Sequence, residues 1–207
     1  MAQFVIGFLP FSLHLVVAHL ILSSGLTTCS AARTHPLEKS STGSTEFIRT
    51  SCEATTYPRV CFNSLSAYAS TIQTSPRQMA LAALSVTLFG ARSTSDALLK
   101  MSAQGLKMKP REKAAMTDCL ANLSDSVDEI RRSTGEMGHL SGPNFDLKLN
   151  DIQTWVSAAL TDEDTCMDGF EGMTGKVRTA VRGKIVKVAQ LTSNALALVN
   201  GLAASAP

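Results

Sequence analysis

The stretch "TWVSAALTDEDTCMDGF", Thr154 to Phe170, places its apolar residues at helical spacing, with one cysteine on the same face. Residues three or four apart lie on one side of a helix, so this repeat predicts an amphipathic α-helix. The apolar stripe extends beyond the stretch in both directions and includes one carboxylic acid. Its members are Phe145, Leu149, Ile152, Val156, Ala159, Glu163, Cys166, Phe170 and Met173.

Three further stretches after Ser75 repeat the pattern. Ser75 as N-cap, Pro76 at the first helical position and Gln78 closing a capping box predict the start of the first helix, and Pro110 begins the second. Short connections force neighbouring helices to run antiparallel. We therefore expect an all-α protein, an up-down-up-down four-helix bundle over residues 75–203. The other three stripes are Leu81, Leu84, Leu88, Ala91, Ser95 and Leu98; Met116, Leu120, Leu123, Val127, Ile130, Thr134 and Met137; and Val181, Ile185, Val188, Leu191, Ala195, Leu198 and Leu202.

Two short helical segments precede the bundle, around Glu46–Glu53 and Arg59–Ala69. Pro58 separates them, because proline cannot continue a helix and biases the residue before it away from helical geometry. We expect a small helical hairpin over residues 45–70, so that the folded domain covers residues 45–204.

The first 32 residues contain no Lys, Arg, Asp or Glu and include a mainly apolar run from Val5 to Leu22. Small residues follow, and Ser30-Ala31-Ala32 resembles a cleavage site. This pattern predicts a secretory signal peptide over residues 1–32, with a retained membrane anchor as the alternative. A polar stretch with Pro, Gly and Ser then predicts a flexible lead-in over residues 33–44.

Cleavage of the signal would remove Cys29 and leave four cysteines, an even number suited to an oxidising compartment. Cys52 and Cys61 lie on the two arms of the hairpin. Measured from the turn between their helices, Cys119 and Cys166 lie at heights of about 27 and 31 Å, less than one helical turn apart. The architecture therefore favours the pairs Cys52–Cys61 and Cys119–Cys166 among the three connectivities.

The residues of the stretch from Thr154 to Phe170 do not match a metal site or a catalytic thiol. Its acids match no EF-hand register, and zinc would need more thiols or histidines nearby. A catalytic thiol needs a base, whereas His139 lies at the far end of the bundle from Cys166. No nucleotide, hydrolase or metalloprotease motif occurs, and a net charge of +2 does not indicate nucleic-acid binding. We expect no enzyme activity, no metal and no cofactor.

Two sets of polar residues remain. The first lies away from the apolar stripe and forms an exposed polar face on the third helix: Thr154, Ser157, Thr161, Asp164 and Asp168. The second is a basic stripe that begins the fourth helix: Lys176, Arg178, Arg182, Lys184 and Lys187. We expect the acids and bases of these neighbouring helix ends to pair across the surface, with binding of a polyanion as the alternative.

Three segments, "TEFIRTSCEATTYPRVC", "TDCLANLSDSVDEI" and "DIQTWVSAALTDEDTCMDGF", resemble the plant invertase and pectin methylesterase inhibitor family. The resemblance covers Thr45 to Leu202 and implies the same bundle, hairpin and two disulfides. It also implies a secreted, non-catalytic protein of the apoplast and cell wall, which covers the active-site cleft of a carbohydrate-acting enzyme.

Within that family the third segment is similar to the methylesterase-inhibitor branch. The invertase branch is associated with a Pro-Lys-Phe tripeptide, where this chain has Pro143-Asn144-Phe145. The expected function is therefore non-covalent inhibition of pectin methylesterase, with acid invertase as the alternative target and a pectin-binding wall module as the second alternative.

The expected inhibitory function leads to predictions of the residues that contact the enzyme and pectin. Helical phase predicts that Thr154, Ser157, Thr161 and Asp164 contact the enzyme, and the Lys176–Lys187 stripe is the candidate for a weak contact with pectin. Asn122 begins an N-glycosylation sequon, Asn122-Leu123-Ser124. We expect no nucleic-acid partner, and no membrane association after the signal is removed.

Overall fold

The computed structural model describes residues 36–104 and 108–204, with side chains from residue 42 onward. The predicted signal peptide lies outside the described residues. The described part is helical and contains no strand, and none of its helices is long and apolar enough to cross a membrane.

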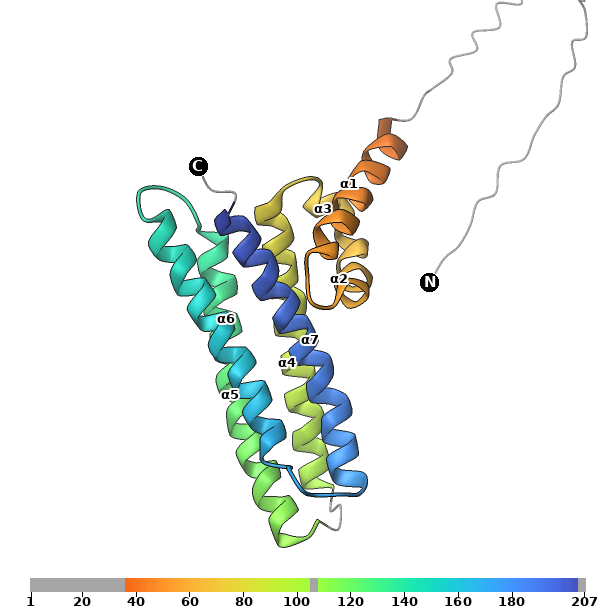
Figure 1. Ribbon diagram of the computed structural model, residues 1–207, viewed down its shortest axis with the longest axis vertical. Helices are drawn as coiled ribbons and strands as arrows, with labels where there is room; N and C mark the ends of the chain where they lie inside the picture. Colours follow the sequence, from red (N-terminus) through yellow and green to blue (C-terminus); the bar gives the residue numbers. More distant parts are fainter. Residues whose placement is uncertain (1–35, 105–107, 205–207) are drawn as a thin grey trace, which may run out of the picture. The chain divides into compact units, whose positions relative to one another are not determined.

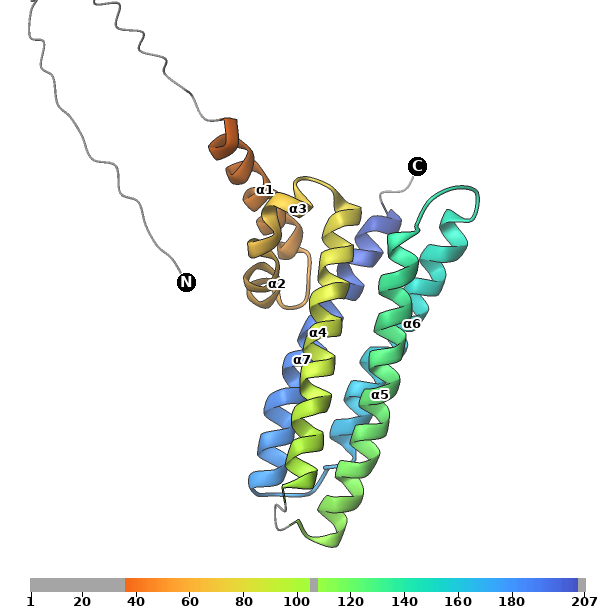
Figure 2. The same ribbon diagram turned by 180° about the vertical axis from the view of Figure 1, so that it is seen from behind.

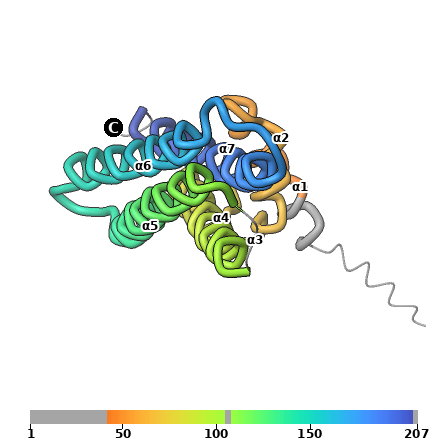
Figure 3. The backbone as a smooth tube through the Cα atoms, turned by 90° about the horizontal axis from the view of Figure 1, so that it is seen from below, coloured from red at the N-terminus to blue at the C-terminus, as the bar shows by residue number. Residues whose placement is uncertain are grey.

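Four long helices form the bundle: α4 (Pro76–Ala103), α5 (Pro110–Gly138), α6 (Phe145–Asp168) and α7 (Lys176–Ala204). Each helix contacts two others, so the order around the bundle is α4, α5, α6 and α7, with α7 returning to α4 (Figure 3). Figures 1 and 2 show that successive helices run antiparallel. The predicted up-down-up-down bundle is confirmed.

The helix starts follow local chemistry. Ser75 Oγ accepts a hydrogen bond from the backbone N–H of Gln78 at 3.2 Å, and Pro76 occupies the first turn of α4. The predicted capping box is not completed there, because the N–H of Ser75 donates instead to the carbonyl of Ile72. At α5 the N–H of Lys109 donates to Glu112 Oε2 at 2.8 Å.

The hairpin consists of α1 (Pro36–Glu53), α2 (Pro58–Leu65), the 3-10 turn η1 (Ser66–Tyr68) and α3 (Ala69–Ile72). Helix α1 begins inside the stretch expected to be a flexible lead-in, so residues 36–44 are helical. The physical reason is that Pro36 is well placed at a helix start and no further proline interrupts the chain before Glu53.

One buried side chain attaches the hairpin to the bundle. Asn194 of α7 accepts a hydrogen bond from the backbone N–H of Tyr57 and donates one to its carbonyl, both at 3.0 Å. Tyr57 is the N-cap of α2, where the chain turns between the two hairpin arms. A single amide therefore satisfies both backbone groups of the turn residue and holds the turn against α7.

The core is divided along the bundle axis. A large apolar cluster lies at the hairpin end and includes Ile48, Leu84, Ile152 and Val199. A second lies at the opposite end, around Cys119 and Cys166, and a small one between them joins Ala91, Ile130, Ala159 and Val188. Each large side chain removed from water contributes about 1.5–3 kcal/mol, so both end clusters stabilise the helix pairing.

Two disulfide bonds cross-link these elements. Cys52 and Cys61 join α1 to α2 with a Cα–Cα distance of 5.6 Å. Cys119 and Cys166 join α5 to α6 at 4.1 Å, inside the second apolar cluster. All four sulfurs are buried, so none is available as a nucleophile or as a metal ligand.

Candidate functional site

The exposed side of α6 carries a row of small polar residues. Thr154, Ser157, Thr161 and Asp164 are all exposed and, being three or four residues apart, lie along one side of the helix. The structure therefore places these four candidate residues on one solvent-exposed side of α6.

The threonines of this row donate their hydroxyl protons internally. Thr154 Oγ1 donates to the carbonyl of Asn150 at 2.9 Å, and Thr161 Oγ1 donates to the carbonyl of Ser157 at 3.1 Å. Their remaining lone pairs point to solvent as acceptors. Together with the carboxylate of Asp164, the row presents mainly hydrogen-bond acceptors, so a complementary partner supplies donors.

A hollow of about 240 Å³ opens between α5 and α6, on the side of α6 that faces α5 and around the helix from this row. Four acids and one base line it: Asp125, Asp128, Glu129, Arg132 and Asp162. Sequence analysis missed this group, although Asp125 and Glu129 are spaced i, i+4 on α5, because their partner Asp162 comes from another helix.

Two carboxyls of the hollow meet directly. Partial burial, together with the nearby carboxyl of Asp162, raises the pKa of Glu129 to about 7. Burial likewise raises the pKa of Asp162. Neighbouring like charges disfavour double ionisation, so Glu129 keeps its proton above the usual range of a carboxylic acid.

A third acid lies inside the bundle. Glu163 is wholly buried, and its Oε1 accepts hydrogen bonds from Ser126 Oγ of α5 at 2.9 Å and from Thr192 Oγ1 of α7 at 2.8 Å. Its second oxygen, Oε2, is buried without a partner. Burial raises the pKa of Glu163 to about 8, against the opposing effect of the two hydroxyl donors. The group is neutral in mildly acidic and neutral solution and belongs to the core.

The predicted charge pairing between the ends of α6 and α7 is wrong. Within the described residues the ion pairs join Arg49 to Glu46, Arg131 to Asp128 and Lys148 to Glu136, and none involves a basic residue of α7. Those side chains divide between two sides of α7, as helical spacing requires, and do not form one stripe that faces the acids of α6.

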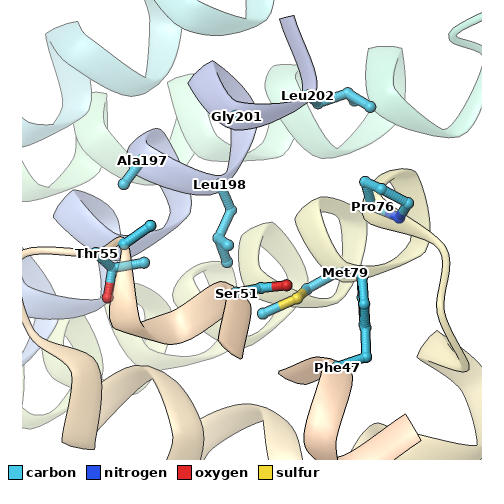
Figure 4. A pocket seen from close by; sticks show the side chains of 10 residues that line it. Phe47, Ser51, Thr55, Pro76, Met79, Ala197, Leu198, Gly201 and Leu202 are labelled. Atoms are coloured by element: carbon cyan, nitrogen blue, oxygen red, sulfur yellow. The ribbon is translucent and has the colours of Figure 1, made fainter. Parts of the chain in front are cut away.

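An apolar hollow of about 260 Å³ lies between α1, the first turn of α4 and the last turns of α7 (Figure 4). Phe47, Met79 and Leu198 extend toward one another across it, and its hydroxyl groups come from Ser51 and Thr55. No ionisable side chain lines this hollow. It therefore offers no acid, base or nucleophile for catalysis.

The described residues also contain no group of three His, Cys, Asp or Glu side chains that could hold a metal ion. What remains as the candidate site is the polar surface of α5 and α6. It has the character of a binding surface, because the row on α6 is exposed and faces outward.

Comparison with known proteins points to the same kind of site. The family model described as plant invertase/pectin methylesterase inhibitor matches residues 46–198. The chain belongs to this inhibitor family. The resemblance found in the sequence is thereby confirmed, and the match includes the hairpin and nearly all of the bundle.

Several curated plant proteins are similar to this chain in sequence. The chain is 46% identical over 191 residues to the "21 kDa protein" of Daucus carota, covering 89% of this chain and 94% of that protein. It is 45% identical over 167 residues to "Pectinesterase inhibitor 9" of Arabidopsis thaliana, covering 77% and 82%. It is 45% identical over 163 residues to "Pectinesterase inhibitor 11" of the same plant, covering 76% and 80%.

Solved structures of the inhibitor family share the fold. A crystal structure of a mutant form of a pectin methylesterase inhibitor from Arabidopsis aligns with a TM-score of 0.61 at 21% identity, covering 74% of this chain and 95% of that one. Another pectin methylesterase inhibitor from Arabidopsis thaliana aligns at 0.54 and 20% identity. These likenesses confirm the bundle architecture.

Proposed function

We propose that this protein inhibits pectin methylesterase by forming a non-covalent complex that covers the enzyme's substrate cleft. The observation that carries the proposal is the family match over residues 46–198, joined to relatives named pectinesterase inhibitors at 45% identity. Occlusion is the proposed mode of action, since the candidate surface on α6 is exposed and polar and could be covered by a partner.

The proposed binding surface is formed by α5 and α6 together. A stable protein–protein contact buries about 800 Å² on each partner, which exceeds what one helix face offers. The row Thr154, Ser157, Thr161 and Asp164 supplies exposed acceptors, and the acidic hollow on the α5 side of α6 extends the surface onto α5. Donors on the enzyme, from backbone amides or from lysine and arginine side chains, complement this surface.

Acid invertase is the second candidate target, because the matching family model describes inhibitors of both enzymes. The relevant local feature is Pro143-Asn144-Phe145 at the start of α6, where Pro143 and Asn144 are exposed. The chain has Asn where the invertase branch is associated with Lys, so the cationic group of that tripeptide is missing. This difference favours the methylesterase.

One experiment separates the two targets. The oxidised protein is titrated into a plant pectin methylesterase assayed by acid release from methylated pectin, and in parallel into a cell-wall invertase assayed on sucrose. Inhibition of the methylesterase alone supports the proposal. Inhibition of the invertase alone would replace it with the second candidate.

We further propose that the protein acts outside the cell. The two disulfide bonds and the predicted signal peptide support this location. A fusion of the full chain to a C-terminal fluorescent protein is expected in the cell wall after plasmolysis, and retention of the fluorescence in the cytoplasm would contradict it.

Asn122 is proposed as a glycosylation site. It lies on α5, half-buried, and Ser124 of its sequon is exposed. Treatment of the plant-secreted protein with an endoglycosidase is expected to lower its mass by one glycan, and replacement of Asn122 by Gln is expected to remove that difference.

A further inference from the structure

The four bundle helices divide into an acidic layer and a basic layer. Helices α5 and α6 together carry twelve acidic and five basic residues, a formal charge of −7. Helices α4 and α7 carry eight basic residues and one acidic residue, a formal charge of +7. Because α5 neighbours α6, and α7 neighbours α4, the two charges lie on opposite sides of the bundle (Figure 3).

Four of the eight basic residues of this layer are lysines that lie on one side of α7 and on the adjoining end of α4. Lys184 precedes Leu191 by two helical turns, and Leu191 packs against Gly90 of α4, so Lys184 lies on the side of α7 that faces α4. Lys187 and Lys176 lie near the same side, at i+3 and i−8 from Lys184. Lys100 lies on the neighbouring part of α4 and is exposed. These four lysines define the lysine row, which spans about 16 Å along α7.

No lysine of the row forms an ion pair with another described residue, although Asp96 lies one helical turn before Lys100 on α4. Within the described residues, the three ion pairs lie on α1, on α5 and between α5 and α6, so none involves a lysine of the row. Lys100, Lys176 and Lys187 are exposed and Lys184 is half-buried. A row of unpaired ammonium groups on one face attracts a polyanion and holds it by charge, with little demand on geometry.

We infer that the lysine row binds carboxylated pectin, the product of the enzyme that this protein is proposed to inhibit. The inference rests on the proposed function, because hydrolysis of pectin methyl esters leaves a polymer of uronate carboxylates. That polymer is extended and anionic, and it presents carboxylates repeatedly along its length, which matches a row of lysines. Methyl-esterified pectin lacks these charges and is not bound.

The charge division determines how the two partners are arranged. The acidic layer repels uronates, so the polymer occupies the α4–α7 face and leaves the α5–α6 face for the enzyme. Charges separated by more than about 8 Å at physiological ionic strength are largely screened, so the acids of the far layer weaken this attraction only slightly. The inhibitor thus accumulates on pectin that the enzyme has already processed, with its inhibitory surface directed away from the polymer.

The test measures polymer binding without any enzyme. The oxidised wild-type protein is titrated with a fluorescently labelled oligogalacturonate at low salt, with the fully methyl-esterified oligomer as the control ligand. Binding to the acid form alone is expected, weakened by at least about tenfold between 20 and 200 mM NaCl because exposed charges are screened. Absence of binding at low salt, or equal binding of the esterified oligomer, would overturn the inference.

Matched variants locate the site. The triple variant K176Q/K184Q/K187Q is expected to bind the oligogalacturonate about tenfold more weakly, a loss of about 1.4 kcal/mol. The control K113Q/R131Q/R132Q removes the same number of positive charges from the acidic layer and is expected to bind like the wild type. Equal losses in both variants would show that net charge, and not the lysine row, is responsible.

Two further measurements are needed. The first tests whether the lysine row prefers oligogalacturonate to other polyanions, and the second tests whether the polymer and the enzyme bind different faces. Heparin or anionic lipid vesicles that bound more tightly than oligogalacturonate would overturn the assignment to pectin. Addition of oligogalacturonate is expected to change the inhibition constant for the methylesterase by the same factor in the wild type and in K176Q/K184Q/K187Q. A change confined to the wild type would show that polymer and enzyme compete for one face. Because the binding assay contains no enzyme, failure of the inference is distinguishable from failure of the proposed function.

Discussion

Glu163 Oε1 accepts a 2.8 Å hydrogen bond from Thr192 Oγ1, and both side chains are wholly buried where α6 meets α7. The acid belongs to the apolar stripe of α6 and lies in the bundle interior beside the small central core cluster. Its second oxygen has no partner, so ionisation would leave a charge in the core with only two hydroxyl donors to stabilise it. This arrangement makes the stability of the bundle depend on pH.

The first prediction is that the protein is more stable at pH 5 than at pH 8. The pKa of Glu163 is raised from 4.5 to about 8 on folding, so the folded chain keeps a proton that the unfolded chain releases. The stability from this group is fully present below pH 4.5 and is lost as the pH rises through 8, by at most about 5 kcal/mol. The variant E163Q keeps the shape and an acceptor and cannot ionise, so the difference between its melting temperatures at the two pH values is expected to shrink. A difference as large as in the wild type would show that other groups cause it.

The second prediction concerns the carboxyl pair between α5 and α6. The pKa of Glu129 is raised to about 7, so at pH 8 Glu129 is largely ionised beside the carboxyl of Asp162, whose pKa is also raised. Replacement E129Q is expected to raise the melting temperature at pH 8 and to leave it unchanged at pH 5, measured by calorimetry at low salt. The control D128N changes a carboxyl that is paired with Arg131, and it is not expected to stabilise the protein at pH 8. Equal stabilisation by both variants would contradict a specific Glu129–Asp162 effect.

The third prediction separates the two disulfide bonds. Cys119–Cys166 closes a sequence separation of 47 residues within the bundle, so its loss by C119S/C166S is expected to cost up to about 4 kcal/mol. Cys52–Cys61 closes a separation of 9 residues, so its loss is expected to cost less and to increase proteolysis of the hairpin first. Chemical denaturation and limited trypsin digestion measure the two effects. If the hairpin bond proved the more stabilising of the two, this ranking would be wrong.

The fourth prediction tests the binding face. Replacement T161K or S157R is expected to abolish inhibition of pectin methylesterase with little change in circular dichroism or melting temperature, because both residues are exposed. Replacement A159D places a charge at a wholly buried position of the same helix and is expected to unfold the bundle.

A control for the binding face lies on the opposite layer. Thr179 of α7 is exposed and donates its hydroxyl to the carbonyl four residues earlier, as Thr161 does. The variant T179K is therefore expected to inhibit like the wild type. Loss of inhibition in T179K, with normal inhibition by T161K, would move the binding face to the basic layer.

The fifth prediction concerns the attachment of the hairpin. Replacement N194L removes the hydrogen bonds to both backbone groups of Tyr57, and a net loss of about 1 kcal/mol for each is expected. Hydrogen exchange should accelerate at the Tyr57 turn more than in α5 and α6. The variant N194D keeps the acceptor, but at neutral pH it buries a carboxylate facing the carbonyl of Tyr57, so it is expected to destabilise the protein at least as much as N194L. Unchanged exchange at the turn in N194L would show that other contacts hold the hairpin.

The sequence by itself determined the fold class, because its signals act over a few residues. Apolar residues at spacings of three and four locate each long helix, and Ser75-Pro76 and Pro110 locate two of the starts within one residue. The same local reasoning missed the helical start of α1 at Pro36, since polar composition alone does not exclude a helix.

Only the tertiary structure decided the relationships between helices. Asn194 and Tyr57 are 137 residues apart in sequence, and Glu163 lies 37 and 29 residues from its two hydroxyl partners, so no local pattern identifies these contacts. The proximity of Glu129 to Asp162 likewise depends on which faces of α5 and α6 pack together. Periodicity assigns a residue to the inside or outside of a helix, whereas the partner it meets there depends on the packing of the whole bundle.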